Sequence, residues 1–216
     1  MKIACLIFDK FTALDVIGPY EVLSRLPGAE LSFVAKETGQ NRSDTGALAL
    51  TADRTLAEMP NPDLLLVGGG EGNRPMLDDP EILDWLRTAD ERTTWTTSVC
   101  TGALILGAAG LLEGKRATTH WAYLERLRQY GAEPVSERYV VDGKVATAAG
   151  VSAGLDMALG LVARIAGQDV AKAIQLGIEY DPAPPFDAGS PDKAGPELVE
   201  LLRQYEGVAE TSETSA

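Results

Sequence analysis

Cysteine, histidine and aromatic residues are scarce in this sequence, which has two cysteines, one histidine and 6% aromatic residues among 216 positions. Two cysteines are too few for a disulfide framework, and Cys5 stands in an apolar run, residues 3–8, of the kind that forms a buried strand. The chain must therefore bury its core without covalent cross-links, which its length allows. We expect it in a reducing compartment, the cytoplasm.

Basic residues and long hydrophobic runs are also in short supply. The 19 lysines and arginines are outnumbered by 32 acidic residues, for a net charge of −13. Nucleic acid and anionic membrane surfaces bind basic faces, so we expect neither as a partner. The N-terminal apolar run ends at Asp9 and Lys10 after about six residues, which is too short for a signal-peptide core or a membrane span, and no other segment approaches that length.

Apolar stretches of strand length alternate with stretches of helical periodicity along the chain. This alternation predicts an α/β fold, a mostly parallel sheet with helices on both faces, in which ligands bind at the carboxyl ends of the strands. We expect one domain over residues 1–207, since no repeat or linker divides it. The acidic residues 208–216, rich in serine and threonine, are predicted to be disordered.

The periodicity and the turn residues place the individual elements. Strands are predicted at 2–8, 31–35, 63–67, 93–99 and 117–119, with a short edge strand at 46–51 and a hairpin of 138–141 and 144–148 around Asp142-Gly143. Helices are predicted at 12–23, 79–92, 102–110, 121–130, 152–166, 169–180 and 196–206. Ser152 and Asp169 are the expected helix caps. The proline-rich residues 181–191 form an extended arm, either a surface connector or a segment whose Phe186 docks on a partner subunit.

Cys100 lies at a predicted corner between a strand and a helix. The β-branched run 93–99 favours a strand, and the small residues of 102–110 favour a closely packed helix. At such a corner the thiol faces the first free N–H groups of the helix, which favour thiolate over thiol. This strand, sharp turn and helix match the nucleophile elbow of hydrolases, with cysteine in place of serine. A buried structural cysteine is the alternative.

Three further segments bring polar groups to the same edge of the predicted sheet, since Asp15, the glycines 68–70 and His120 each follow a strand. A carboxyl group beside a cysteine in an apolar pocket can give and take protons, so Asp15 is a candidate acid and base, although capping a helix is its commoner role. Gly69 and Gly70 either offer backbone N–H groups to a ligand or form a tight turn. His120 is either a helix cap or a participant in proton transfer.

These segments resemble the ThiJ/PfpI superfamily of glutamine-amidotransferase-like proteins over about residues 2–195. The resemblance is carried by Leu14-Asp15 with Gly18-Pro19, the glycines 68–70, Val99-Cys100-Thr101-Gly102 and Ala117-Thr118-Thr119-His120-Trp121. Within the superfamily the sequence is most similar to the isocyanide hydratases, through aspartate at position 15, threonine at 101 and the run 175–186. Protease-like members carry histidine directly after the cysteine, where this chain has Thr101.

The resemblance implies a flavodoxin-like three-layer sandwich, a homodimer, and no metal or organic cofactor. It also implies an enzyme that adds water to an isocyanide and gives an N-substituted formamide through a covalent cysteine thioimidate. In that reaction Cys100 is the nucleophile, Asp15 manages the protons and Thr101 contributes a polar contact. Gly69, Gly70 and His120 are then the expected substrate-binding residues.

Two other functions stay open at this point. One is a glyoxalase- or deglycase-like activity, in which the cysteine adds to an aldehyde and His120 assists proton transfer. The other is a non-enzymatic sensor that is read out by oxidation of Cys100. A transcription regulator of the same superfamily is not expected, because about 20 residues and an acidic tail follow the arm, too few for a helix-turn-helix domain.

Overall fold

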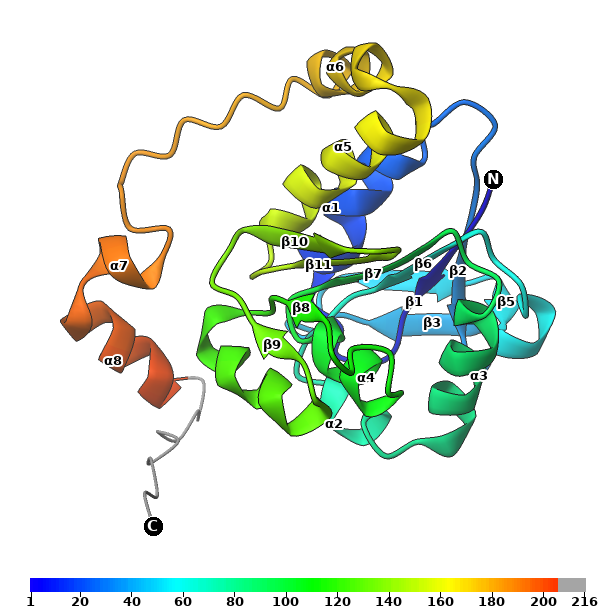
Figure 1. Cartoon of the computed structure of the whole chain (residues 1–216), viewed down its shortest axis with the longest axis horizontal. Coiled ribbons are helices and arrows are strands. Elements are labelled where there is room, and N and C mark those ends of the chain that lie inside the picture. Colours follow the sequence, from blue (N-terminus) through cyan, green and yellow to red (C-terminus); the bar gives the residue numbers. More distant parts are fainter. Residues whose placement is uncertain (206–216) are drawn as a thin grey trace.

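Seven strands form the central sheet of the computed structural model, which describes residues 1–205 (Figure 1). Their order is β10-β11-β7-β6-β1-β2-β5, and every neighbouring pair is parallel except the β10–β11 hairpin. The predicted, mostly parallel sheet and its hairpin are confirmed. The strands of this sheet are β1 (Lys2–Leu6), β2 (Glu30–Ala35), β5 (Arg54–Thr55), β6 (Leu64–Val67), β7 (Trp95–Val99), β10 (Tyr139–Asp142) and β11 (Val145–Ala148).

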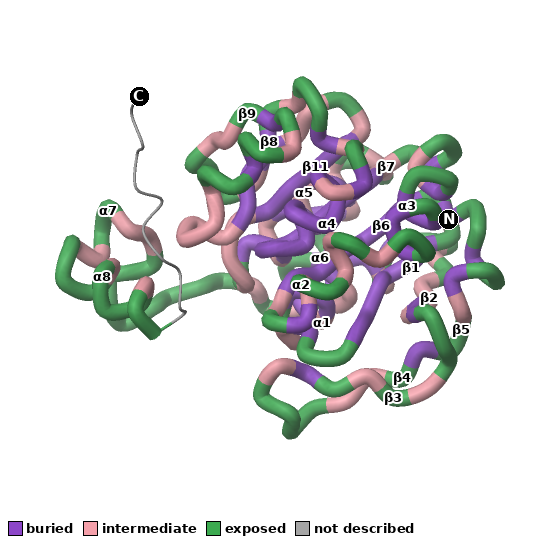
Figure 2. Tube along the Cα trace, turned by 90° about the horizontal axis from the view of Figure 1, so that it is seen from below, coloured by how far each residue is buried: buried purple, intermediate pink, exposed green. Residues whose placement is uncertain are grey.

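Helices cover both faces of the sheet, which makes the predicted three-layer sandwich (Figure 1). All four residues of β6 are buried, and Figure 2 shows the buried residues gathered in the central strands and on the inner sides of the helices. One face carries α1 (Ala13–Leu23) and α5 (Ala153–Ala166), which pack together, with α6 (Gln168–Gly177) against α5. The other face carries α2 (Asn73–Met76), α3 (Pro80–Asp90) and α4 (Gly102–Ala108).

The local sequence determines where helix α3 begins and which of its side chains are buried. Asp79 caps it by accepting hydrogen bonds from the N–H groups of Glu81 and Ile82, at 3.0 and 3.4 Å, and Pro80 occupies a first-turn position where its missing N–H costs nothing. Ile82 and Leu86, four residues apart, are both buried. The predicted amphipathic helix at 79–92 is thereby confirmed to within two residues at its end.

The short strands differ from prediction. The segment expected as an edge strand at 46–51 is β4 (Ala49–Ala52), which pairs with β3 (Gly39–Arg42) in a separate two-stranded sheet, and β5 forms the edge of the main sheet instead. The strand expected at 117–119 is β8 (Arg116–Ala117), which pairs with β9 (Glu133–Pro134) outside the main sheet. Such short strands are decided by tertiary pairing, which local propensity does not encode.

Three helical details also differ. The segment Trp121–Tyr130 is a 3₁₀ helix, η2, and a shorter one, η1 (Leu56–Glu58), precedes β6. Ser152 makes no capping hydrogen bond; instead its hydroxyl accepts one from Arg138 at 3.3 Å. Asp169 lies in the first turn of α6, whose cap is Gly167, and α6 ends at Gly177, three residues earlier than predicted.

The C-terminal arm is extended, as predicted. No helix or strand lies between Gly177 and Pro191, and two helices follow, α7 (Pro191–Ala194) and α8 (Pro196–Tyr205). Both stand apart from the sandwich in Figures 1 and 2. The predicted disordered tail 208–216 lies outside the described residues. Within residues 1–205 no helix is long and apolar enough to cross a membrane.

Candidate active site

Cys100 occupies the corner between β7 and α4, with a φ of 56°. This left-handed conformation is unfavourable for a residue with a side chain, so the surroundings must hold it. They do so at both peptide groups, because the Cys100 N–H donates to the carbonyl of Ala149 at 2.8 Å and its carbonyl accepts from the Thr119 hydroxyl at 2.6 Å. The predicted strand-turn-helix corner is therefore present, with its cysteine fixed in place.

Glycine lets the corner press against the neighbouring strand. A Cβ added to Gly102 would lie 2.1 Å from the carbonyl oxygen of Val67, and one added to Gly69 would lie 2.4 Å from the Thr101 hydroxyl. Neither site has room for a side chain, which brings β6 and its glycine run directly beside the start of α4.

We expect Gly102→Ala to lower the free energy of unfolding by about 1–3 kcal/mol or more, because the backbone atoms that its methyl group meets cannot rotate away. Gly177→Ala is the matched control, since a Cβ there meets no atom within 4 Å and its helical backbone accepts alanine. Urea unfolding of the two variants measures the difference. Equal stabilities would show that the corner is not tightly packed.

Asp15 lies in the first turn of α1 and is completely buried. One carboxylate oxygen, Oδ2, accepts a hydrogen bond from the Gly69 N–H at 2.8 Å, whereas Oδ1 is buried with no hydrogen-bond partner among the described residues. Burial raises the pKa of Asp15 to about 7, against the lowering effect of hydrogen bonds from Gly69 and the Cys100 thiol. The carboxyl thus contacts the thiol and can hold or release a proton near neutral pH. It does not act as the cap of α1, which is Thr12.

The Cys100 thiol is itself buried, and its acidity differs from the sequence-based expectation. Burial raises its pKa well above the ordinary value, and the charge of Asp15 raises it further. The N–H groups of Thr101 and Val151 lower it, as predicted for a helix start, but they are outweighed. Burial is thus the dominant influence on the pKa of Cys100, and the predicted preference for thiolate is wrong. A protonated thiol beside the carboxyl of Asp15 is the ground state.

The glycine run ties the two halves of the site together. The Gly69 N–H is bound to Asp15 and the Gly70 N–H donates to the Thr101 hydroxyl at 3.1 Å, while the Gly69 carbonyl accepts from the Thr12 N–H at 2.8 Å. The two donors predicted to meet a substrate are therefore already engaged with neighbouring side chains. Their arrangement positions Asp15 and Thr101 relative to the corner.

His120 lies at the start of η2, where its Nδ1 accepts a hydrogen bond from the Ala122 N–H at 3.4 Å. Its ring also borders Gly150, where an added Cβ would come within 2.8 Å of the ring carbon Cδ2. Gly150 directly precedes Val151, whose N–H faces the thiol. The capping role is observed, and the ring lies against the loop that flanks the cysteine, so a role in substrate binding stays a prediction.

Sequence reasoning missed two residues that contact the corner. Thr119 holds the Cys100 carbonyl, and Val151 directs its N–H at the thiol from a strained conformation with a φ of 24°. The sequence does not predict the hydrogen bond of Thr119, because a threonine in a predicted strand is not unusual. A β-branched residue with positive φ is against local preference, so only the folded structure reveals the second.

The described residues contain no group of three or more histidine, cysteine, aspartate and glutamate side chains placed to hold a metal ion. Both cysteines are free and buried. Ser98, in β7 just before the corner, also has a buried hydroxyl oxygen without a partner among the residues described.

Comparison with known proteins agrees with this geometry. Residues 1–164 match the model of the DJ-1/PfpI family. An isonitrile hydratase of Pseudomonas putida is 45% identical over 204 residues, which cover 94% of this chain and 89% of that protein. The crystal structure of a ThiJ/PfpI family protein from Pseudomonas syringae superposes with a TM-score of 0.92 at 38% identity, over 95% of this chain and 86% of that one.

A more distant relative is the HTH-type transcriptional regulator CdhR of Pseudomonas aeruginosa, which is 32% identical over 63% of this chain but over only 40% of its own length. The family match spans most of the sandwich and includes Asp15, the glycine run, Cys100 and His120. The chain therefore belongs to the DJ-1/PfpI family.

Proposed function

We propose that this protein is an isocyanide hydratase, which adds water to an isocyanide (isonitrile) and releases an N-substituted formamide. The observation that carries the proposal is the buried pair of Cys100 and Asp15, in which a thiol contacts a carboxyl with a pKa of about 7. The similarity to the Pseudomonas putida isonitrile hydratase, over nearly the whole chain, supports the choice of substrate. An uncharged, apolar substrate also suits a site whose thiol and carboxyl are both buried.

In the first step the sulfur of Cys100 bonds to the terminal carbon of the isocyanide. The thiol proton passes to the carboxylate of Asp15 as the bond forms, and Asp15 then delivers it to the same carbon. The product is a thioimidate, R–N=CH–S–Cys, which contains every atom of the thiol and the isocyanide. Asp15 suits this task because a pKa near 7 lets it accept a proton and return it with little cost in either direction.

In the second step water attacks the thioimidate carbon. Asp15 takes a proton from the water, a carbon–oxygen bond forms, and the carbon–sulfur bond then breaks. Nitrogen receives one proton and the departing sulfur another, so that formamide, R–NH–CHO, and the free thiol result. The N–H groups of Thr101 and Val151, which face the sulfur, stabilise the negative charge that develops on it as it leaves.

The remaining site residues position these groups. The Gly70 N–H fixes the Thr101 hydroxyl at 3.1 Å, and the Gly69 N–H fixes Asp15 at 2.8 Å, so the glycine run acts on the substrate through side chains that it orients. The His120 ring lies against Gly150 and so supports the backbone that leads to Val151, whose N–H faces the thiol. We assign no proton transfer to His120 in this mechanism.

The proposal is tested by incubating the full chain with a simple aryl or alkyl isocyanide and, in parallel, with methylglyoxal. Formation of the formamide, followed by its infrared or ultraviolet absorption, is the expected result. Turnover of methylglyoxal without formamide would instead establish the glyoxalase-like activity. If neither compound reacts and mild peroxide converts Cys100 to a stable sulfinic acid, the sensor function replaces the proposal.

The rate of hydration is expected to rise with pH through about 7. Burial raises the pKa of Asp15 to about 7, so below that pH the carboxyl is protonated and cannot accept the thiol proton. On the acid side kcat/KM should then fall by about tenfold per pH unit. A pH profile, corrected for uncatalysed acid hydrolysis of the isocyanide, measures this. A wild-type profile with no inflection between pH 6 and 8 would contradict the base role of Asp15.

A further inference from the structure

The carbonyl group of Cys100 is held by a side chain that comes from another part of the sequence. Thr119 lies two residues after β8, and its hydroxyl donates to this carbonyl at 2.6 Å. Both residues are buried, so the hydrogen bond lies inside the protein, where it is electrostatically stronger than in water. Thr119 takes no part in the proton transfers proposed above, so its contact with the corner needs a separate explanation.

This carbonyl shares a peptide unit with one of the N–H groups that face the thiol. The carbonyl of Cys100 and the N–H of Thr101 are the two ends of one planar unit, and that N–H lowers the pKa of the Cys100 thiol. The Thr119 hydroxyl therefore binds one end of a rigid unit whose other end faces the sulfur. Because rotation of the unit moves both ends together, a hydrogen bond that fixes the carbonyl also fixes the direction of the N–H.

The corner needs such a restraint because the backbone of Cys100, with its φ of 56°, is in an unfavourable conformation. On the N-terminal side the Cys100 N–H donates to the carbonyl of Ala149 at 2.8 Å, which fixes the preceding peptide unit. The unit that follows Cys100 is held by Thr119 at 2.6 Å and by a longer hydrogen bond from the Ala103 N–H, at 3.3 Å. Thr119 is therefore the stronger of the two restraints on the peptide unit whose N–H faces the thiol.

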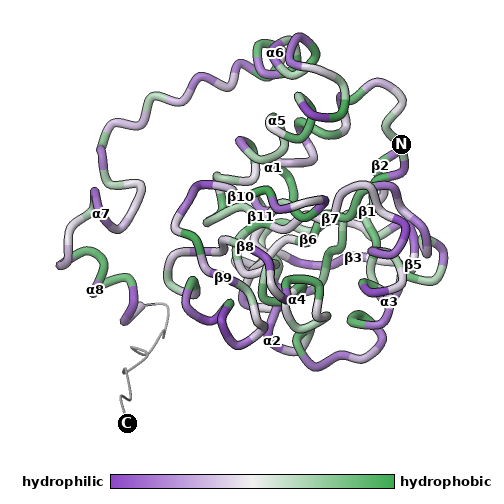
Figure 3. Tube along the Cα trace, in the orientation of Figure 1, coloured by the Kyte–Doolittle hydropathy of each residue, from purple (hydrophilic) through white to green (hydrophobic). Residues whose placement is uncertain are grey.

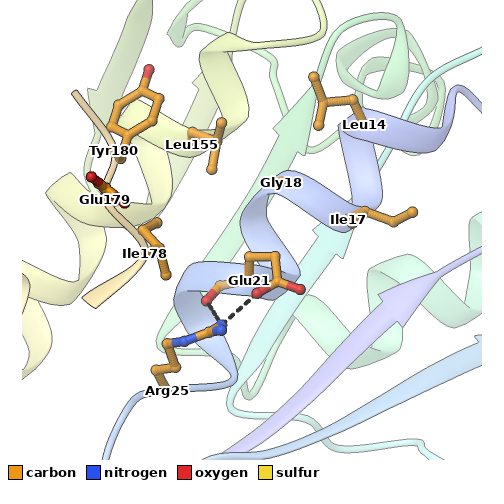
Figure 4. Close-up of a pocket in the computed structure, with 9 residues that line it drawn as sticks. All are labelled: Leu14, Ile17, Gly18, Glu21, Arg25, Leu155, Ile178, Glu179 and Tyr180. Carbon is orange, nitrogen blue, oxygen red and sulfur yellow. Dashed lines mark hydrogen bonds and ion pairs between the residues drawn. The ribbon is translucent and has the colours of Figure 1, made fainter. Parts of the chain in front are cut away.

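The elements beside the corner are largely apolar. All of β6 and six of the seven residues of α4 are buried, and Figure 3 shows hydrophobic residues along both. The described residues form a groove of about 440 Å³ between α1 and α5, but neither Cys100 nor Thr119 is among the residues that line it (Figure 4). Negative charge on the buried sulfur therefore depends on hydrogen-bond donors of the protein, and the strength and direction of each donor matter.

We propose that Thr119 is a positioning residue for the nucleophile and acts through the peptide unit between Cys100 and Thr101. Its hydroxyl keeps the N–H of that unit directed at the sulfur and, by polarising the carbonyl, makes the N–H a stronger donor. The charge that develops on the sulfur as it attacks or leaves is thereby stabilised. The inference rests on the nucleophilic role proposed for Cys100. Val151 supplies a second N–H that does not depend on Thr119, so loss of the hydroxyl weakens this stabilisation without abolishing it.

Thr119→Val tests the inference, because valine has nearly the shape of threonine but cannot donate a hydrogen bond. Thr118→Val is the matched control: Thr118 is equally buried, and its hydroxyl donates at 3.1 Å to the carbonyl of Glu137 rather than to that of Cys100. In Thr119→Val kcat for formamide production should fall about tenfold with KM within about twofold, since the hydroxyl acts on the developing charge and not on the substrate. Thr119→Ser keeps the hydroxyl and should restore kcat to within about threefold of the wild type, and Thr118→Val should stay within about twofold.

Alkylation of Cys100 by iodoacetamide tests the same contact without an isocyanide, and peptide mapping by mass spectrometry separates it from alkylation of Cys5. At pH 8 Cys100 should react about five- to tenfold more slowly in Thr119→Val than in the wild type, Thr119→Ser or Thr118→Val. The inference is overturned if Thr119→Val and Thr118→Val lose the same fraction of kcat, if serine fails to restore kcat, or if Cys100 of Thr119→Val is alkylated as fast as that of the wild type. If the wild type forms no formamide, the proposed function fails, and the alkylation rates alone still decide the role of Thr119.

Discussion

Replacing Cys100 with alanine is expected to abolish formamide production, with a fall in kcat/KM of at least about 10⁴-fold. The thiol supplies the atom that bonds to the isocyanide carbon, and the second cysteine, Cys5, cannot replace it because it lies within β1 and not at the corner beside Asp15. The fold should persist, because alanine fits the space of the thiol and relieves no contact of the backbone at this corner. A spectroscopic assay of formamide at saturating isocyanide measures the loss.

Cys5→Ala is the matched control for that variant, because it removes the other buried thiol and leaves the site intact. Its activity should stay within about twofold of the wild type. Denaturing mass spectrometry of wild-type protein during turnover adds a direct check, since the thioimidate increases the mass of the chain by one whole isocyanide. Full activity in Cys100→Ala, or an adduct on Cys5, would refute Cys100 as the nucleophile.

The buried strands and amphipathic helices that form the layers of the fold could be predicted because each has a local sequence pattern. Residues 3–6 of β1 have no polar position, which only a strand covered on both faces tolerates, and the sequence of α3 shows both its cap and its buried side. The register of the small sheets could not be predicted. β4 and β8 are four and two residues long, and whether such a segment joins the main sheet depends on partners distant in the chain.

The sequence predicts which residues meet at the candidate site, but not the pKa of the Cys100 thiol. Parallel strands bring Asp15, the glycine run and Cys100 to one edge of the sheet, which follows from the order of elements alone. The acidity of the thiol did not follow, because the sequence gives the N–H groups of the helix start but not the degree of burial that opposes them. The contact between the Val151 N–H and the thiol could not be predicted either, because it depends on a backbone conformation that valine disfavours.

Asp15→Asn is expected to separate activity from stability at this site. Asparagine keeps an oxygen for the Gly69 N–H but cannot take the thiol proton, so kcat/KM should fall by about 10²–10⁴-fold, and the acid limb of the pH profile should vanish. The same substitution should stabilise the protein at pH 8, because it removes a buried charge whose Oδ1 has no partner among the described residues. Formamide assays and urea unfolding on one preparation test both halves of the prediction.

The sign of the stability effect follows from proton linkage. Folding raises the pKa of Asp15 from 3.8 to about 7, so the folded state binds the proton more tightly and the wild type loses stability as pH rises between these values. At about 1.4 kcal/mol per pKa unit the loss reaches an upper bound of roughly 4 kcal/mol above pH 7. The asparagine variant carries no such penalty, so its advantage over the wild type should be largest at pH 8 and disappear near pH 4. A variant that is both inactive and less stable than the wild type at pH 8 would mean that Asp15 is ionised and satisfied in the folded state, and the proton-transfer role that we assign to it would then fail.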